Sequence, residues 1–219
     1  MHTNLRQAIA SFSHCERIHA VEALCAVFGG PGRWILFAIL LVIPSELFGN
    51  QVRVRLEVTD LNGDPIPSVP VGDNFLLRGL VEDLRPFPEG VFAATVDVFY
   101  NPNLVGISGP IIYDLNYPNG RTGDTTVLAG IIDEVGAFSG FAPLGGGEFP
   151  LFAVPFRADR GGLGQFTLNR PDARGSRMLV YGANTPVSFD DVTFVDAVVD
   201  IEPSSVVGEH VFYNGSVFD

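Results

Sequence analysis

The chain has 219 residues, 47% of them hydrophobic, and it is rich in glycine and proline, with 25 and 16 residues respectively. This composition favours a domain of many short strands joined by turns. All 13 basic residues are arginines, against 25 acidic residues, which gives a net charge of −12. Because such a field repels phosphate backbones, we expect no nucleic acid partner.

An apolar run of ten residues, at positions 34–43, follows Arg33 and ends at Pro44. A helix that spans a bilayer needs about 20 apolar residues, so this run suits the central region of a signal peptide. We therefore predict that residues 1–49 are an N-terminal extension and signal peptide, and that the protein is secreted or lies at the cell surface. No clean Ala-x-Ala site follows the run, so an uncleaved signal anchor is the alternative. We expect membrane contact only through such an anchor.

Both cysteines, Cys15 and Cys25, precede the apolar run, and none follows it. Disulfides therefore cannot stabilise the remainder of the chain, and its stability must come from apolar burial. We predict one domain at 50–203 and a C-terminal tail or linker at 204–219, which ends without a clear stop and so suggests truncation. A domain of about 150 residues buries roughly 68–70% of its unfolded surface, which is enough for a stable core.

Strict alternation of apolar and polar residues marks the first strands of this domain. Residues 52–59 read VRVRLEVT, which predicts a strand with one buried face. A second strand is predicted at 75–81. The third, at 91–100, places Ala94, Val96 and Val98 inward and Thr95 and Asp97 outward, and it ends in the turn Asn-Pro-Asn at 101–103.

Further short strands are predicted at 104–108, 131–138, 150–159, 165–168, 178–181 and 192–201, with an irregular surface excursion at 109–130 that contains a short strand at 111–113. Turn signals recur about every 10 residues, and no capped amphipathic helix follows position 50. The sequence therefore predicts an all-β sandwich or barrel.

Three blocks resemble one family. The stretch 90–104 reads GVFAATVDVFYNPNL, and the blocks at 71–75 and 149–168 follow the same order as in the cohesin-like β-sandwich modules of secreted bacterial multidomain proteins. The sequence departs from the family pattern at Asn101, where Asp is usual. The resemblance covers 71–201 and implies a jelly-roll sandwich of about nine strands, related to some carbohydrate-binding modules. It also implies a non-catalytic role in which one sheet face binds a dockerin module.

Asp60, Asn62 and Asp64 have the first three spacings of a calcium-binding loop. Such a loop needs Gly and Glu further on, where this chain has Pro65 and Val71. The pattern therefore predicts a connection between two strands, and we expect neither a metal nor another cofactor.

Few groups are available for catalysis. From position 50 onward the chain has no Cys, no Lys and a single His, His210. No pair of carboxylates is singled out as the acid and base of a glycosidase. We therefore predict that the protein is not an enzyme.

Three roles as a binding or structural module stay open. The first is attachment to another protein module such as a dockerin, through a sheet face that carries Thr95 and Asp97 or through the 109–130 excursion. The second is carbohydrate binding, with Tyr113 and Tyr117 as an aromatic platform on which a sugar ring stacks. The third is a structural spacer without a partner.

Overall fold

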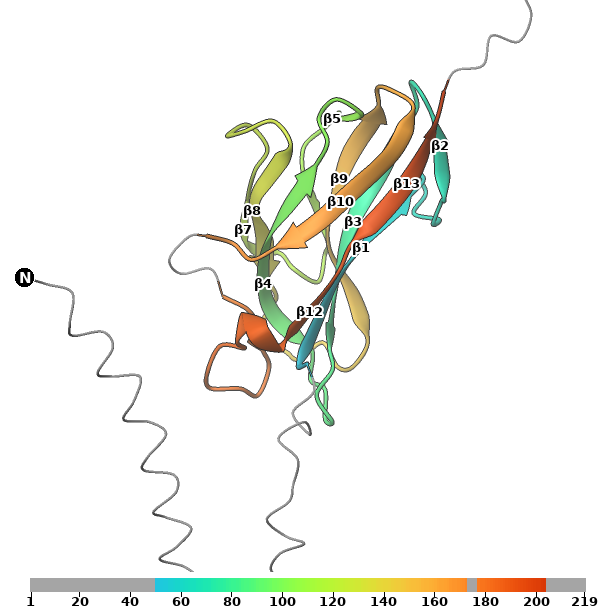
Figure 1. The fold of residues 1–219 in the computed structure, drawn as a ribbon. Helices are drawn as coiled ribbons and strands as arrows, with labels where there is room; N and C mark the ends of the chain where they lie inside the picture. Colours follow the sequence, from blue (N-terminus) through green and yellow to red (C-terminus); the bar gives the residue numbers. More distant parts are fainter. Residues whose placement is uncertain (1–49, 173–176, 204–219) are drawn as a thin grey trace, which may run out of the picture. The chain divides into compact units, whose positions relative to one another are not determined.

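The computed structural model describes residues 50–172 and 177–203. The chain divides into two compact units, 1–48 and 49–219, and the described residues all belong to the second. They form two β-sheets that pack face to face (Figure 1). Within these residues no helix is long and apolar enough to cross a membrane. The predicted signal peptide at 1–49 and the tail at 204–219 lie outside the described residues.

The first sheet, sheet A, has six strands. Its order along the sheet is β12 (Val192–Val195), β1 (Val52–Thr59), β3 (Asn74–Asp83), β9 (Glu148–Ala158) and β5 (Val105–Ile107), and β6 (Ile112–Tyr113) also pairs with β9.

The second sheet, sheet B, has seven strands. Its order is β2 (Ser68–Pro70), β13 (Ala197–Glu202), β10 (Gly162–Asn169), β4 (Val91–Tyr100), β8 (Ile131–Phe138) and β7 (Asn119–Asp124), and β11 (Leu179–Val180) also pairs with β4.

The all-β sandwich predicted from the sequence is confirmed. Nine of the strands in the described residues have four residues or more, and the other four are segments of two or three residues. β1, β4 and β8 have the bounds that the sequence predicted, β1 and β4 from alternation and β8 from its apolar content. β7 was missed, because all six of its residues are exposed and no apolar alternation marks it within the 109–130 excursion.

Aromatic side chains from both sheets meet in the core. Phe75 and Phe156 stack at 5.7 Å on the inner face of sheet A, and Phe166 and Tyr100 of sheet B meet Phe156 edge to face at 5.1 and 5.0 Å. Val52, like Phe75 and Phe156, has no exposed surface. A fully buried side chain of this kind contributes about 1.5–3 kcal/mol, so the core can stabilise the fold without disulfides.

One predicted strand is divided between the two sheets. Residues 192–201 were predicted as one strand, but β12 pairs with β1 in sheet A and β13 pairs with β10 in sheet B, and the buried positions change phase between them. Asp196 stands between them, and its carboxylate accepts a hydrogen bond from the Leu168 backbone at 2.9 Å. The chain therefore crosses from one sheet to the other at this residue.

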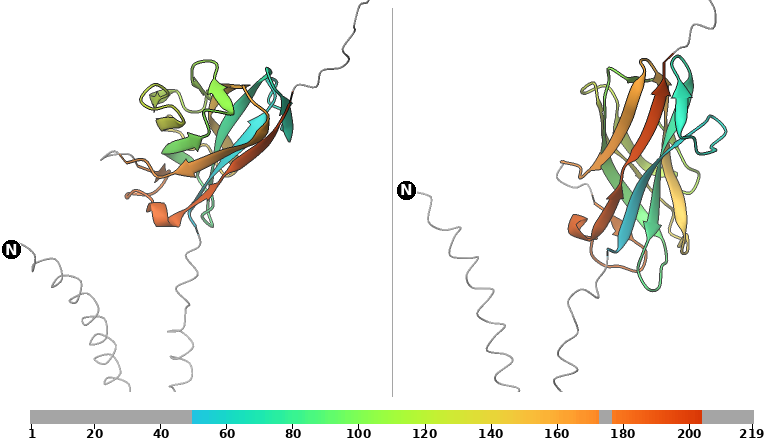
Figure 2. Two further views of the ribbon diagram at one scale, coloured as in Figure 1. Left: turned by 45° about the horizontal axis from the view of Figure 1, so that its top comes forward. Right: turned by 45° about the vertical axis from the view of Figure 1, so that its right-hand side comes forward.

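The two ends of the described chain leave the sandwich at opposite ends. β1 begins beside the end of β3, where Val52 pairs with Asp83. β12 runs parallel to β1, and the chain then continues in β13 to the other end of the sandwich (Figure 2). The sandwich therefore has one end where β1 begins and an opposite end where β13 stops.

Candidate binding surface

The outer face of sheet A is occupied by ion pairs. Arg55 pairs with Glu148 at 2.6 Å and with Glu57 at 2.9 Å, and Arg53 pairs with Glu82. The hydrogen bond to Glu148 raises the pKa of Arg55, and the same bond lowers the pKa of Glu148. These charges are paired within the face, so covering them with a partner would cost desolvation without forming new pairs.

The outer face of sheet B is different, because it exposes apolar side chains among polar ones, with the acidic Asp200 opposite Leu163 in the register. Leu163 of β10 is 58% exposed and Val198 of β13 is 57% exposed. Phe99 of β4 is partly exposed and lies between Thr167 of β10 and Ile131 of β8 in the sheet register. We call the outer surface of β13, β10, β4, β8 and β7 the B face.

The B face continues to β7 through Phe138. A Cβ atom added to Gly120 of β7 would lie 1.8 Å from the Phe138 ring, so the ring fits only over a residue without a side chain. Gly120 also has a φ of 53°, which few other residues adopt. The sequence of this edge strand therefore keeps a partly exposed aromatic ring on the B face.

Thr95 and Asp97 were predicted on the outer side of β4, and only Thr95 is accessible there. Thr95 is half-buried opposite Gly136 of β8. Asp97 is only 6% exposed, and its carboxylate accepts a hydrogen bond at 2.9 Å from the Glu134 backbone, where β8 bulges and Glu134 has a φ of 50°. Burial raises the pKa of Asp97, and the charge of Asp133 adds to the shift, against the opposing hydrogen bond. The expectation that Asp97 faces solvent is wrong, because the bulge covers it.

The two tyrosines proposed as a sugar platform do not form one. The Tyr117 ring has no exposed surface, and its hydroxyl donates to the Val91 carbonyl at 3.0 Å. Burial raises the pKa of Tyr117. Tyr113 is half-buried, donates to the Thr122 carbonyl, and has the Arg121 guanidinium 5.5 Å from its ring centre. Both rings therefore pack the 109–130 segment onto the sandwich.

The calcium-like pattern forms the turn after β1. The Asp60 carboxylate accepts hydrogen bonds from the backbone of Asn62 at 2.8 Å and of Asp64 at 2.9 Å, and from the Asn62 side chain at 3.1 Å. The hydrogen bond from Asp64 is the main cause of a lowered pKa at Asp60. The described residues contain no group of three His, Cys, Asp or Glu side chains arranged to hold a metal ion.

The sequence analysis did not single out Asp83, a carboxylate that accepts hydrogen bonds from Arg85, Glu89 and Gly90. Its side chain is fully buried and accepts from the Arg85 guanidinium at 2.7 and 2.9 Å, and from the backbone of Glu89 and Gly90 at 3.0 Å. Burial is the largest single influence and would raise its pKa, but the hydrogen bonds from Arg85 and Gly90, together with the Arg85 charge, outweigh burial and lower the pKa. Alternation along β3 places Asp83 at an inward position. An acid at an inward position could have indicated a buried carboxylate from the sequence alone.

No protein-family model matches this chain, and no curated protein matches it. The matching solved structures include the third cohesin of ScaC from Acetivibrio cellulolyticus, solved with the ScaB dockerin, at 14% identity and a TM-score of 0.47 over 68% of this chain and 98% of that one. A cohesin module of a Clostridium perfringens family 33 glycoside hydrolase matches at 16% identity and a TM-score of 0.48, over 69% and 98% of the two chains.

A third match is the OlpC cohesin of Clostridium thermocellum, solved with a dockerin, at 12% identity and a TM-score of 0.49, over 70% of this chain and 94% of that one. These structures are cohesin modules, the family that the sequence resembles. Likeness at this level does not determine function, which has to be judged from the surfaces of this chain.

Proposed function

We propose that this chain is an exported, non-catalytic module that binds a second protein module through the B face. The observation that carries the proposal is the contrast between the two outer faces. Sheet A presents mostly charges that are already paired, whereas the B face presents Leu163, Val198 and Phe99 to solvent, with Gln165, Thr167 and the acidic Asp200 among them. Apolar side chains surrounded by a polar rim are the composition of a protein interface.

The size of the B face fits such an interface. Its five neighbouring strands are spaced at roughly 4.8 Å, and about eight residues of each rise roughly 3.3 Å apiece, so the face covers about 600 Å². A standard protein interface buries about 800 Å² on each partner. The B face with its adjoining loops is therefore large enough to dock one small module.

The chemistry of the domain supports binding rather than turnover. Residues 50–203 contain no His, Cys or Lys, so cysteine and lysine nucleophiles and histidine bases are lacking in this range. The buried acid Asp97 is hydrogen-bonded within the sheet. An acidic chain with a net charge of −12 is also a poor partner for nucleic acid.

A dockerin-type module is the partner that we propose, in an extracellular or cell-surface assembly. Dockerins are the partners present in two of the solved cohesin structures. The apolar run at 34–43 is the sequence feature that supports export. The carbohydrate alternative has lost its two-tyrosine platform, since Tyr117 is buried.

The test is calorimetric titration of the chain with a panel of dockerin modules, and with cellulose and xylan oligosaccharides in parallel. We expect at least one dockerin to bind and the sugars not to bind. Phe99→Asp on the B face should weaken the complex by about tenfold or more, which is about 1.4 kcal/mol. The matched control is Ile112→Asp, which changes an exposed residue on the opposite sheet and should leave affinity unchanged. Sugar binding without dockerin binding would contradict the proposal.

A further inference from the structure

A group of carboxylates lies on the B face where β8 bulges. Two residues of β8, Asp133 and Glu134, stand opposite Asp97 of β4, and the bulge that they form covers its side chain. Burial is the main cause of the raised pKa of Asp97, and the charges of Asp133, Asp172 and Glu134 raise this pKa further. All four carboxylates are therefore close enough to repel one another. We call Asp97, Asp133, Glu134 and Asp172 the acidic band.

The chain does not neutralise this band as it neutralises the acids of sheet A. Within the described residues, Asp97, Asp133 and Asp172 form no ion pair, whereas the glutamates on the outer face of sheet A pair with arginines. Arg170, two residues before Asp172, pairs instead with Asp190 at 2.5 Å. The B face therefore carries negative charge that a bound partner could pair.

Asp97 is the member of the band that costs the fold most. Only 6% of its surface is exposed, and its Oδ1 accepts from the Glu134 backbone at 2.9 Å. No other hydrogen bond to this carboxylate forms within the described residues, and the residue that faces it on β10 is the neutral Asn169. A nearly buried carboxylate without a counter-charge destabilises a folded protein. Perturbed acids of this kind gather at functional sites, which indicates that a partner supplies the missing cation.

We infer that the module docked on the B face presents an arginine to the acidic band. This inference rests on the proposed docking at the B face, and it specifies the chemistry of the partner. Asp133 is half-buried and within reach of a docked side chain, and Asp97 adds its charge from beneath the bulge. Complementary charge of this kind fixes the register of an interface and discriminates against wrong partners.

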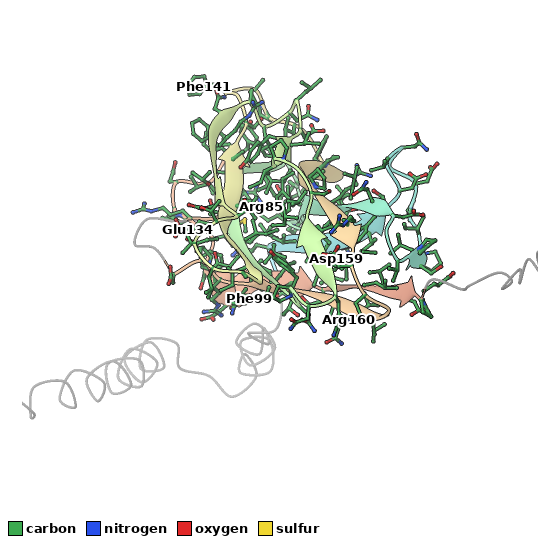
Figure 3. All side chains as sticks on the ribbon, turned by 90° about the horizontal axis from the view of Figure 1, so that it is seen from above. Arg85, Phe99, Glu134, Phe141, Asp159 and Arg160 are labelled. Carbon is green, nitrogen blue, oxygen red and sulfur yellow. The ribbon has the colours of Figure 1, made fainter. Side chains whose placement is uncertain are left out.

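Phe99 favours arginine over lysine as the docked side chain. Phe99 lies two residues from Asp97 on the same outer side of β4, and it is 36% exposed. Figure 3 shows Phe99 together with Glu134 of the neighbouring strand β8. A planar guanidinium can stack on an aromatic ring and pair with carboxylates at the same time, whereas an ammonium is a strongly hydrated point charge.

Two other interpretations of the acidic band fit less well. A metal ion would need several carboxylates that converge on one point, and the described residues contain no group arranged to hold one. Acids that only keep a surface soluble would lie in full contact with water, but Asp97 is buried and Asp133 is half-buried. A partner's cation accounts for both the charge of the band and its partial burial.

The first test removes one charge of the band and measures the affinity of the full chain for a bound dockerin by calorimetry at pH 7. Asp133→Asn should weaken the complex by about fivefold or more. The matched control is Asp64→Asn, which removes the same charge from an exposed position in the turn after β1 and should change the affinity by less than about twofold. Unchanged affinity in Asp133→Asn would overturn this inference and leave the proposed function standing. No binding by any dockerin would overturn both.

The second test separates binding from folding at Asp97. Asp97→Asn should melt at a higher temperature than the native chain, because it removes a buried charge without a counter-charge, and it should bind the same dockerin about tenfold more weakly. Lower stability together with weaker binding would give Asp97 a structural role, and tighter binding would show that the band repels the partner. Either result would overturn the inference.

The third test uses pH. The pKa of Asp97 is raised in the free chain, and a docked arginine would favour the charged carboxylate and so lower this pKa in the complex. The complex then holds fewer protons than the free chain, so the affinity should decrease as the pH falls through the raised value. The decrease should be smaller for Asp97→Asn with the same dockerin. An affinity of the native chain that increases toward acid would indicate a neutral or acidic partner surface and overturn the inference.

The last test identifies the arginine on the partner. Each arginine of the bound dockerin is replaced in turn by methionine, and each variant is titrated against the native chain and against Asp133→Asn. At least one replacement should weaken binding to the native chain by about fivefold or more and have a smaller effect on binding to Asp133→Asn. Equal losses against both chains for every arginine would overturn the inference.

Discussion

Replacing Asp83 with alanine should be among the most damaging single changes in this domain. The Asp83 carboxylate has no exposed surface, and it holds loop 84–90 by accepting from the Arg85 side chain and from the backbone of Glu89 and Gly90. The variant would leave the buried Gly90 N–H without a partner and the Arg85 guanidinium without its counter-charge. Both effects destabilise the folded state.

The magnitude follows from the burial of the pair. Removing one partner of a buried, hydrogen-bonded ion pair costs about 3–5 kcal/mol, a large part of the 5–15 kcal/mol that is typical of whole domains. The chain supplies a matched control in Arg157 and Asp159, which are also an arginine and an aspartate two residues apart, paired at 2.6 Å but largely exposed. Removing Asp159 should cost at most about 1 kcal/mol.

Urea denaturation of Asp83→Ala and Asp159→Ala at pH 7 measures both costs. The pKa of Asp83 is lowered in the folded state, so its contribution is present above the ordinary value of about 3.9 and is lost as the pH falls through the lowered folded value. The stability gap between the native chain and Asp83→Ala should therefore narrow below about pH 4. Equal losses of unfolding free energy in the two variants at pH 7 would show that burial does not make the Asp83 pair more important for stability than the Asp159 pair.

Three further changes test other parts of the structure. Asp97→Asn keeps an acceptor for the Glu134 backbone and removes a charge whose pKa is raised by burial and by Asp133, so it should increase stability at pH 7. The native chain should lose stability as the pH rises through the raised folded pKa, and thermal melts of the variant should not show that loss. Val98→Asp puts an unpaired carboxylate into the core and should lower the free energy of unfolding by several kcal/mol in chemical denaturation. An unchanged denaturation midpoint would contradict the inward position of Val98 on β4. Calcium titration should leave the melting temperature flat, because Asp60 is engaged within its turn, whereas a site filled at 100 times its dissociation constant would add about 2.7 kcal/mol.

Alternation of apolar and polar residues predicted the strands that bury one face. It did not predict strands that pair through their backbone without burying side chains. β1 and β4 carry apolar residues at every second position, so period two predicted their bounds. β7 pairs with β8 through its backbone while all six residues stay exposed, so its side chains carry no signal. The crossing at Asp196 was also missed, although the buried positions change phase there, from Val192 before it to Ala197 and Val199 after it.

The candidate surface was predictable only in part. Alternation along β4 placed Thr95 on the outer side, but the bulge in β8 that covers Asp97 depends on pairing between strands. The neighbours of Phe99 on the B face come from β10 and β8, about 65 and 30 residues along the chain, and strand order alone brings them together. The burial of Tyr117 likewise depends on its hydrogen bond to Val91 across the fold.

Methyl chemical-shift mapping with a bound dockerin tests whether the B face binds a protein module. We expect shifts at the methyl groups of Leu163 and Val198 on the B face and none at Leu76 and Ile112 on the outer face of sheet A. Shifts confined to Leu76 and Ile112, or no change at any of these residues across the whole dockerin panel, would contradict it.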